Sequence, residues 1–119
     1  MEVDYDTNNI FAKILRGEIP CTKIYEDDFA LAFEDINPQA PIHLLIVPKK
    51  IIPTLNDLAD SDFELIGKMF RVAQKLAKEN NLSESGFRTV FNCNEDGGQT
   101  VYHLHLHLIG GRQLHWPPG

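Results

Sequence analysis

A chain of 119 residues has room for one compact domain and not for two, and its 43% hydrophobic and 24% charged residues exclude a disordered chain. A formal net charge of −6 argues against a DNA or RNA partner, because a polyanion would meet a repulsive field rather than a basic surface. A mononucleotide is still compatible with this charge, since local donors can hold one phosphate.

The two cysteines and the N-terminal residues indicate the cellular compartment of the protein. Cys21 and Cys93 have no CxxC spacing and are expected to be free thiols. Residues 1–9 are polar and acidic, which predicts no secretory or transit segment, and nowhere do 18 apolar residues run together. We therefore expect a cytoplasmic protein without a membrane partner.

The first half of the chain predicts one short helix and three strands. Residues 8–17 combine an asparagine cap, apolar residues at helical spacing and a terminal glycine. Residues 23–26 and 30–34 are strand-like runs separated by two aspartates, which is typical of a β-hairpin. Residues 42–47 are nearly all apolar and lie between two prolines, which predicts a buried strand.

The second half predicts a longer helix and two more strands. Apolar residues recur every three or four positions across residues 61–79, and Ser61 and Glu64 have the spacing of a capping box. Residues 87–93 and 101–109 alternate as strands on either side of a glycine turn. Because the strands do not alternate regularly with helices, we expect an α+β domain over residues 1–119, with a five-stranded antiparallel sheet and two helices.

The strongest chemical signal is a run of alternating histidines and leucines. Period two places His103, His105 and His107 on one face of a strand, and Leu104, Leu106 and Leu108 on the other. The leucines belong to the core. Packing alone poorly explains three imidazoles in strict alternation, because buried imidazoles need polar partners.

Two kinds of site suit such a row. Zinc is one, but alternate positions on a strand lie about 6.7 Å apart, so two imidazoles could share a metal far more easily than three. Phosphoryl transfer is the other, since one neutral imidazole can attack phosphorus while its neighbours donate hydrogen bonds. The middle imidazole, flanked on both sides, is the natural nucleophile.

This histidine pattern resembles the signature of the histidine triad family, and the similarity to its Hint-type branch extends over nearly the whole sequence. The matching segments include Ile10-Phe11, Ile19-Pro20, Asp35-Ile36, Pro38-Gln39-Ala40-Pro41, Val47-Pro48-Lys49-Lys50 and Gly97-Gly98-Gln99-Thr100-Val101-Tyr102. The resemblance implies a homodimer whose two sheets lie side by side. It also implies that residues 110–119, which include Trp116, lie near the partner subunit's active site.

The resemblance further implies a role for each site residue. His105 is expected to be the nucleophile, and His103, His107 and His43 are expected to assist it. Asp35 corresponds to the acid that binds ribose, Asn92 and Thr100 to positions near the phosphate or the leaving amine, and the turn at Gly98 and Gln99 to a source of phosphate-binding N–H groups. The purine pocket and tail complete the set of substrate-binding residues: Phe11, Ile14, Ile19, Phe33, Ile36 and Trp116. No metal and no cofactor are expected.

The function implied is hydrolysis of a purine nucleoside 5′-phosphoramidate, and also of aminoacyl-adenylates, to AMP through a nucleotidyl-histidine intermediate. Within the family, a dinucleoside polyphosphate hydrolase is the alternative enzyme, disfavoured by the Trp116-Pro117-Pro118-Gly119 ending. A nucleotidyltransferase is less compatible, since such relatives replace the last triad position. Outside enzymes, a nucleotide-binding scaffold with weak catalysis and a zinc-binding module remain open.

Overall fold

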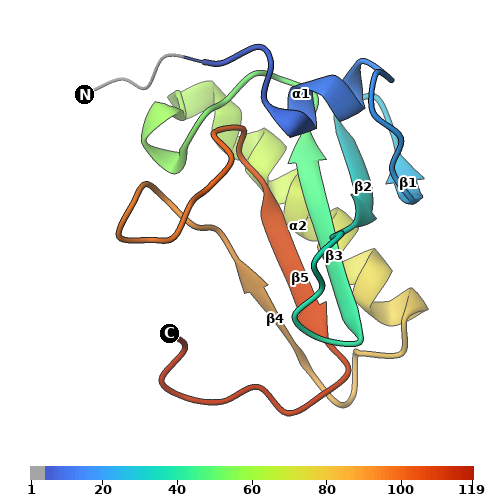
Figure 1. Cartoon of the computed structure of the whole chain (residues 1–119). Coiled ribbons are helices and arrows are strands. Elements are labelled where there is room, and N and C mark those ends of the chain that lie inside the picture. The colour runs from blue at the N-terminus through green and yellow to red at the C-terminus, as the bar shows by residue number, and fades with distance from the viewer. Residues whose placement is uncertain (1–4) are drawn as a thin grey trace.

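The computed structural model describes residues 5–119 and contains one sheet and two α-helices (Figure 1). The elements in chain order are α1 (Ile10–Leu15), β1 (Lys23–Glu26), β2 (Ala30–Glu34), β3 (Ile42–Pro48), α2 (Phe63–Glu79), β4 (Phe87–Val90) and β5 (Leu106–Gly110). Two 3-10 turns, Leu55–Asp57 and Asp60–Asp62, lead into α2. The strand order is β1-β2-β3-β5-β4, and every pairing is antiparallel. The predicted α+β class, hairpin and five-stranded antiparallel sheet are confirmed.

Period-two alternation sorts the strand side chains onto the two faces of the sheet. The face covered by α2 carries Ala30 and Ala32 of β2, Leu44 and Ile46 of β3, and Leu106 and Leu108 of β5. These side chains pack against the buried stripe of α2, which comprises Met69, Val72, Ala73, Leu76 and Ala77. Figure 1 shows α2 behind the strands. The prediction that the leucines of the histidine run lie in the core is confirmed, since Leu104, Leu106 and Leu108 are all buried.

The opposite face of the sheet is covered only in part, by the short helix α1. Phe11 of α1 packs with Leu31 and Phe33 of β2 and with Leu45 and Val47 of β3. The cap of α1 is Asn9, whose side chain accepts a hydrogen bond from the N–H of Ala12 at 2.9 Å. Six residues cover less of a sheet face than the 17 residues of α2 do. The uncovered remainder of this face is where the histidines lie.

The last two strands are shorter than the sequence predicts. β5 starts at Leu106 instead of residue 101, because its partner β3 ends at Pro48, which has no N–H to donate to a ladder. The N–H of Leu104 bonds instead to the carbonyl oxygen of Ile52 at 2.7 Å. β4 ends at Val90 instead of residue 93, since Val90 pairs with His107 and β5 offers only one residue further.

The predicted capping box at Ser61 and Glu64 is also wrong. The chain enters α2 through the 3-10 turn Asp60–Asp62, and the Asp62 carboxylate accepts the N–H of Ala59 at 2.9 Å and pairs with Lys50. The Asp62 side chain therefore caps the 3-10 turn before α2, and α2 itself has no side-chain cap. Over residues 5–119 no helix has the length and apolar character needed to cross a membrane.

Candidate active site

Two neighbouring strands and the segment before β5 bring the histidines together. In an antiparallel pair, residues directly opposite each other share a face. Leu45 of β3 lies opposite His107 of β5, and His43 lies opposite Ile109, so His43 and His107 are diagonal neighbours on the face that α1 leaves uncovered. His105 precedes β5 by one residue, and its ring centroid lies 5.0 Å from that of His107.

A cavity of about 310 Å³ opens beside these rings. Of the predicted site residues, nine line it: Phe11, Ile14, Ile19, Phe33, Asp35, Ile36, Thr100, His105 and His107. Six further lining residues were not predicted: Ile10, Pro20, Cys21, Glu34, Leu45 and Val101. Most of its wall is apolar and comes from α1, residues 19–21 and β2 with neighbouring residues of β3 and the loops, while the imidazoles of His105 and His107 form the other side. Their neighbours in the sequence could have pointed to some of the missed residues. Ile10 and Pro20 lie next to predicted positions, and Leu45 lies two residues after His43 on the same strand face.

The hydrogen bonds of His105 assign its tautomer. Its Nδ1 lies 2.7 Å from the carbonyl oxygen of His103, and a carbonyl oxygen only accepts, so Nδ1 carries the proton. In the neutral ring Nε2 then carries no proton and has a free lone pair. Phe11 contacts the ring edge to face, with centroids 4.8 Å apart and planes at 78°. His105 therefore presents a nucleophilic nitrogen at the cavity in a fixed orientation.

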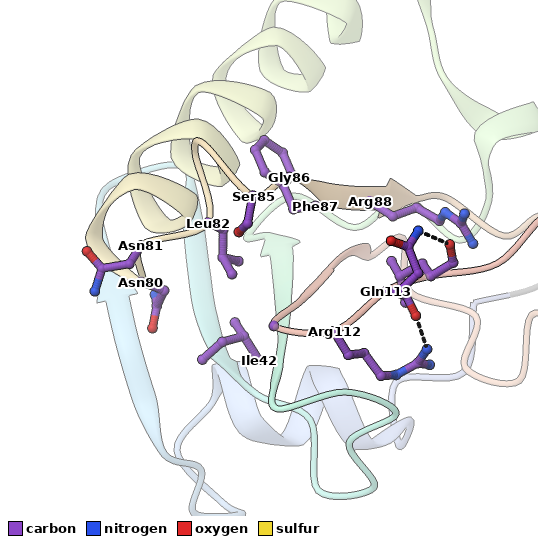
Figure 2. A pocket seen from close by; sticks show the side chains of 12 residues that line it. Ile42, Asn80, Asn81, Leu82, Ser85, Gly86, Phe87, Arg88, Arg112 and Gln113 are labelled. Carbon is purple, nitrogen blue, oxygen red and sulfur yellow. Dashed lines mark hydrogen bonds between the residues drawn. The ribbon is translucent and has the colours of Figure 1, made fainter.

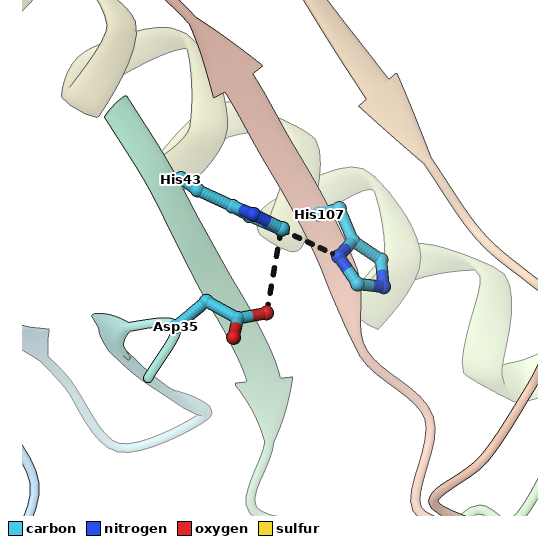
Figure 3. Close-up of side chains that lie close together, drawn as sticks. All are labelled: Asp35, His43 and His107. Atoms are coloured by element: carbon cyan, nitrogen blue, oxygen red, sulfur yellow. Dashed lines mark hydrogen bonds and ion pairs between the residues drawn. The ribbon is translucent and has the colours of Figure 1, made fainter. Parts of the chain in front are cut away.

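A second chain of hydrogen bonds assigns the proton positions of His43 and His107. The backbone N–H of Gln39 donates to Nδ1 of His43 at 3.0 Å, so the proton of the neutral ring is on Nε2. That Nε2 lies 2.9 Å from Nδ1 of His107 and 3.4 Å from Oδ2 of Asp35 (Figure 3). His107 accepts at Nδ1 and is left with its proton on Nε2. Within residues 5–119 this buried Nε2 has no hydrogen-bond partner, which makes it a donor available to a ligand.

Burial keeps all four imidazoles neutral. It lowers the pKa of His105, against the opposing effect of the bond to the His103 carbonyl, and lowers the pKa of His43, against the opposing charge of Asp35. For His107, burial and the neighbouring rings of His105 and His43 lower the pKa to about 4. Neutral rings are required for both a bare Nε2 on His105 and a proton-passing His43.

Asp35, His43 and His107 also have the composition of a metal site, with ligand atoms within 4.8 Å of one another. The donor chemistry does not fit. Because Nδ1 of His43 already accepts from Gln39, a metal on Nε2 would require an imidazolate or the loss of that bond. The two facing nitrogens are 2.9 Å apart, whereas nitrogens on one tetrahedral zinc are about 3.3 Å apart. The arrangement fits a hydrogen-bond relay.

A larger groove, of about 610 Å³, lies past the carboxyl end of β5 (Figure 2). Its two arginines are already engaged. Arg88 donates to the carbonyl oxygen of His115, and Arg112 donates to those of Gln39 and Gln113. Among residues 5–119, no histidine, cysteine or carboxylate lines it. The smaller cavity, which has the histidines, is therefore the candidate active site.

Comparison with known proteins agrees with this geometry. A family model described as the HIT domain matches residues 16–114. The chain belongs to the HIT family. It is 50% identical over 105 residues to a purine nucleoside phosphoramidase of Escherichia coli K12, a match that covers 88% of each chain. A HIT family hydrolase of Legionella pneumophila Philadelphia 1 superposes with a TM-score of 0.92 at 59% identity, covering 94% of this chain and all of that one. A histidine triad protein of Clostridium difficile gives 0.88 at 47% identity, covering 93% and 96%. The predicted resemblance is confirmed.

Several predicted site residues of this HIT protein lie outside the cavity. Gln99 is buried, and its side chain accepts from the N–H of Asn94 and donates to the carbonyl oxygens of Pro53 and Val101. The N–H groups of Gly98 and Gln99 donate to the carbonyls of Glu95 and Asn94. These contacts hold the turn that carries Thr100. Asn92 is half-buried and does not line the cavity, and Trp116, in the tail, is 81% exposed.

His103 is likewise withdrawn from the cavity. Its ring is fully buried, with Nε2 donating to the carbonyl oxygen of Pro48 at 2.8 Å and Nδ1 2.7 Å from the hydroxyl of Tyr5. The HIT pattern thus has two different kinds of histidine: two rings at the cavity and one anchored below it. The groups that sequence reasoning missed are the His103 carbonyl, the Gln39 N–H and Tyr5. The first two are backbone groups, and the sequence does not show which side chain a backbone group will contact.

Proposed function

We propose that this HIT protein is a nucleoside phosphoramidase that hydrolyses the P–N bond of a purine nucleoside 5′-phosphoramidate. The observation that carries the proposal is the complementary pair of tautomers: a bare Nε2 on His105 beside a protonated, unpartnered Nε2 on His107. One ring attacks while the other donates. The 50% identity to a protein named purine nucleoside phosphoramidase supports the choice of substrate.

The first step forms a covalent nucleotidyl-histidine. Nε2 of His105 attacks the α-phosphorus, the P–N bond of the substrate breaks, and the amine leaves with the proton from Nε2 of His107. The attacking ring becomes positively charged, and its Nδ1–H donates to the His103 carbonyl at 2.7 Å, which stabilises that charge. His107 then takes the His43 proton at Nδ1 over the 2.9 Å contact, and His43 takes a proton from solvent beside Asp35, so that neither ring is left as an imidazolate.

The second step releases AMP. Water attacks phosphorus, the bond from phosphorus to His105 breaks, and the attacking water gives one proton back to the relay, which releases one proton to solvent. Asp35 lies 3.4 Å from Nε2 of His43 and stabilises that ring whenever it carries a positive charge. In the net reaction, one phosphoramidate and one water give one AMP and one amine. The enzyme returns to its starting protonation state.

The cavity walls suit a nucleoside. Its apolar end, formed by Phe11, Ile14, Ile19 and Phe33, offers flat contact and little hydrogen bonding, which favours a purine over a smaller base. Asp35 lines the same cavity and lies 3.4 Å from Nε2 of His43. We assign its carboxylate to the ribose hydroxyls, since a carboxylate can accept from two neighbouring hydroxyls.

Intact-protein mass spectrometry during rapid quench with adenosine 5′-phosphoramidate tests the chemistry. The wild-type chain is expected to gain the mass of one AMP moiety on His105 within the first turnover. His105→Ala removes the nucleophile and is expected to show no adduct and no turnover while still binding AMP. Near-normal turnover of His105→Ala would disprove the assignment.

Alkylation of cysteine tests the position of the nucleoside. Cys21 lines the cavity, whereas Cys93 is half-buried outside it, so the chain contains its own control. Burial raises the pKa of the Cys21 thiol, so labelling is best done above pH 8. AMP is expected to protect Cys21 and leave Cys93 labelling unchanged. Equal labelling of Cys21 with and without AMP would place the base elsewhere.

We also propose a homodimer in which two sheets join at β4. Within residues 5–119 the outer edge of β4 pairs with no strand, and Phe70 and Phe87 beside it are 43% and 42% exposed. An unpaired edge next to apolar side chains favours association with a second copy. Sedimentation of Phe87→Glu against wild type tests this: the variant is expected to be monomeric, and a wild-type monomer at micromolar concentration would refute the dimer.

For location, we propose the cytoplasm. Cys21 and Cys93 are both free in the structure, and a reducing compartment keeps such thiols free. Fractionation of cells that express the full chain tests the location, with recovery in the cytoplasmic fraction expected.

A further inference from the structure

The buried ring of His103 is held by two hydrogen bonds that take no part in the proposed chemistry. Its Nε2 donates to the Pro48 carbonyl at 2.8 Å, so in the neutral ring Nδ1 is a bare acceptor. The hydroxyl of Tyr5 lies 2.7 Å from that Nδ1 and donates to it. The two rings are also in edge contact, with centroids 5.7 Å apart at 62°. Tyr5 precedes α1 and is 98 residues away in sequence.

His103 is connected to the reaction through its backbone. Its carbonyl oxygen accepts the Nδ1–H of His105 at 2.7 Å and so sets both the tautomer and the orientation of that ring. Burial lowers the pKa of His103, which keeps the ring neutral and Nδ1 able to accept. The ring is fully buried, so water cannot replace the Tyr5 hydroxyl without opening the structure. The position of this backbone carbonyl therefore depends on how firmly the ring below it is held.

We propose that Tyr5 is a positioning residue for catalysis: its hydroxyl locks the His103 ring in the Nε2–H tautomer, and the locked residue aims the nucleophile through its carbonyl oxygen. This inference rests on the proposed role of His105. The residue acts without touching substrate, because neither Tyr5 nor His103 lines the cavity. Tyr5 thereby acts on the active site of this HIT protein from outside the cavity.

Two substitutions at Tyr5 separate the hydroxyl from the ring. Tyr5→Phe keeps the edge contact and removes only the donor, whereas Tyr5→Ala removes both. A hydroxyl-dependent lock predicts that both variants lose about tenfold in kcat and in the rate of adduct formation, the usual size of one unsatisfied buried group. KM is expected to stay within about twofold, because the cavity walls are unchanged. If the edge contact of the Tyr5 ring alone held His103 in place, Tyr5→Phe would behave as wild type, and this result would overturn the proposal.

Tyr25→Phe is the matched control. It also removes a tyrosine hydroxyl bonded to a partner, in that case Asp27 at 2.6 Å on the β1–β2 hairpin, away from the histidines. It is expected to leave kcat within about twofold of wild type. An equal loss in Tyr25→Phe, or a loss that follows the thermal midpoint across all three variants, would reduce Tyr5 to an ordinary stabilising contact and overturn the proposal.

Ring-nitrogen NMR supplies a readout that does not depend on turnover. In the wild-type chain His103 is expected to show a protonated Nε2 and a bare, hydrogen-bonded Nδ1, and His105 a protonated Nδ1. In Tyr5→Phe the Nδ1 signal of His103 is expected to shift to that of a free acceptor, and the Nδ1–H signal of His105 to broaden. Unchanged signals at both rings would contradict the lock. If His105→Ala retained turnover, the proposed reaction would fail while this test of the contact stood.

Discussion

The two sides of the cavity follow different physical rules. Phe11, Ile14 and Phe33 form a wall whose contacts are non-directional and individually small. His105 and His107 form the other wall, with His43 behind His107, and each proton there has one place because the Gln39 N–H and the His103 carbonyl set the tautomers. We therefore expect the first wall to tolerate graded change and to affect binding. We expect the second to depend on every member and to affect the chemical step.

Replacing the donor ring is expected to have the greatest consequence of the four changes considered below. His107→Ala removes the only imidazole that pairs a cavity-facing N–H with the His43 contact, and kcat is expected to fall by about 10²–10⁴-fold, the range for a general acid. KM for the phosphoramidate is expected to change little. Steady-state kinetics measure both constants.

His115→Ala is the control for that change, since His115 lies in the tail and has an exposed side chain. It is expected to keep wild-type kcat. A His107→Ala variant with more than about a tenth of wild-type kcat would show that water or another group donates the proton.

Acidification affects the imidazole wall and leaves the apolar wall unchanged. Because attack needs a bare Nε2 and burial lowers the pKa of His105, kcat/KM is expected to stay level from pH 8 to below 6.5. At lower pH it is expected to fall by about tenfold per unit. A pH–rate profile with its midpoint at or above 6.5 would contradict the assigned environment of His105.

The free energy of unfolding is expected to fall over a similar range of acidic pH. In the unfolded chain His107 has its ordinary pKa, about 6.5, while in the folded chain the pKa is lowered to about 4. Between these values the unfolded state binds more protons, so the free energy of unfolding falls as the pH drops from 6.5 towards 4 and is constant above that range. Urea titrations at several pH values measure this slope, which is expected to be shallower in His107→Ala.

Trimming the apolar wall is expected to change binding alone. Ile14 lies on α1, lines the cavity and is half-buried, so Ile14→Ala removes about 1–2 kcal/mol of contact with the base and raises KM by about tenfold. kcat is expected to stay the same. Ile24→Ala, an equal truncation on β1 outside the cavity, is the control. A fall in kcat for Ile14→Ala would mean that the two walls are coupled.

Ile36 is expected to matter least of these positions. It lines the cavity but is 91% exposed, so it has little contact to lose. Ile36→Ser is expected to change KM by no more than about threefold and kcat not at all. A larger rise in KM would show that the side chain folds over the base when substrate is bound.

The order of the elements was readable from the sequence because periodicity reports burial. The apolar runs of β2 and β3, the stripe of α2 and the Asn9 cap of α1 are local patterns with local causes. Strand ends were predicted less well. β5 starts at Leu106 because Pro48 ends its partner strand, and a strand that lies so much earlier in the chain is not a local property.

The histidine motif itself predicted which residue types carry the chemistry and that the middle ring was the natural nucleophile. It could not predict that His103 is buried under Tyr5, or that Gln99 holds a turn together through its side chain. Both outcomes depend on which distant groups meet a side chain after folding. Alternation alone places the three imidazoles on one face and does not show which of them reach the cavity.

Residue order thus determined the α+β class and the leucine core and pointed to the histidine run as the candidate site, because these depend on period and side-chain chemistry. Only the folded chain decided the position of each proton. Every chain has backbone N–H and carbonyl groups, and it is the placement of those of Gln39, His103 and Pro48 against particular rings that distinguishes the proposed nucleophile, the proposed donor and the anchored ring.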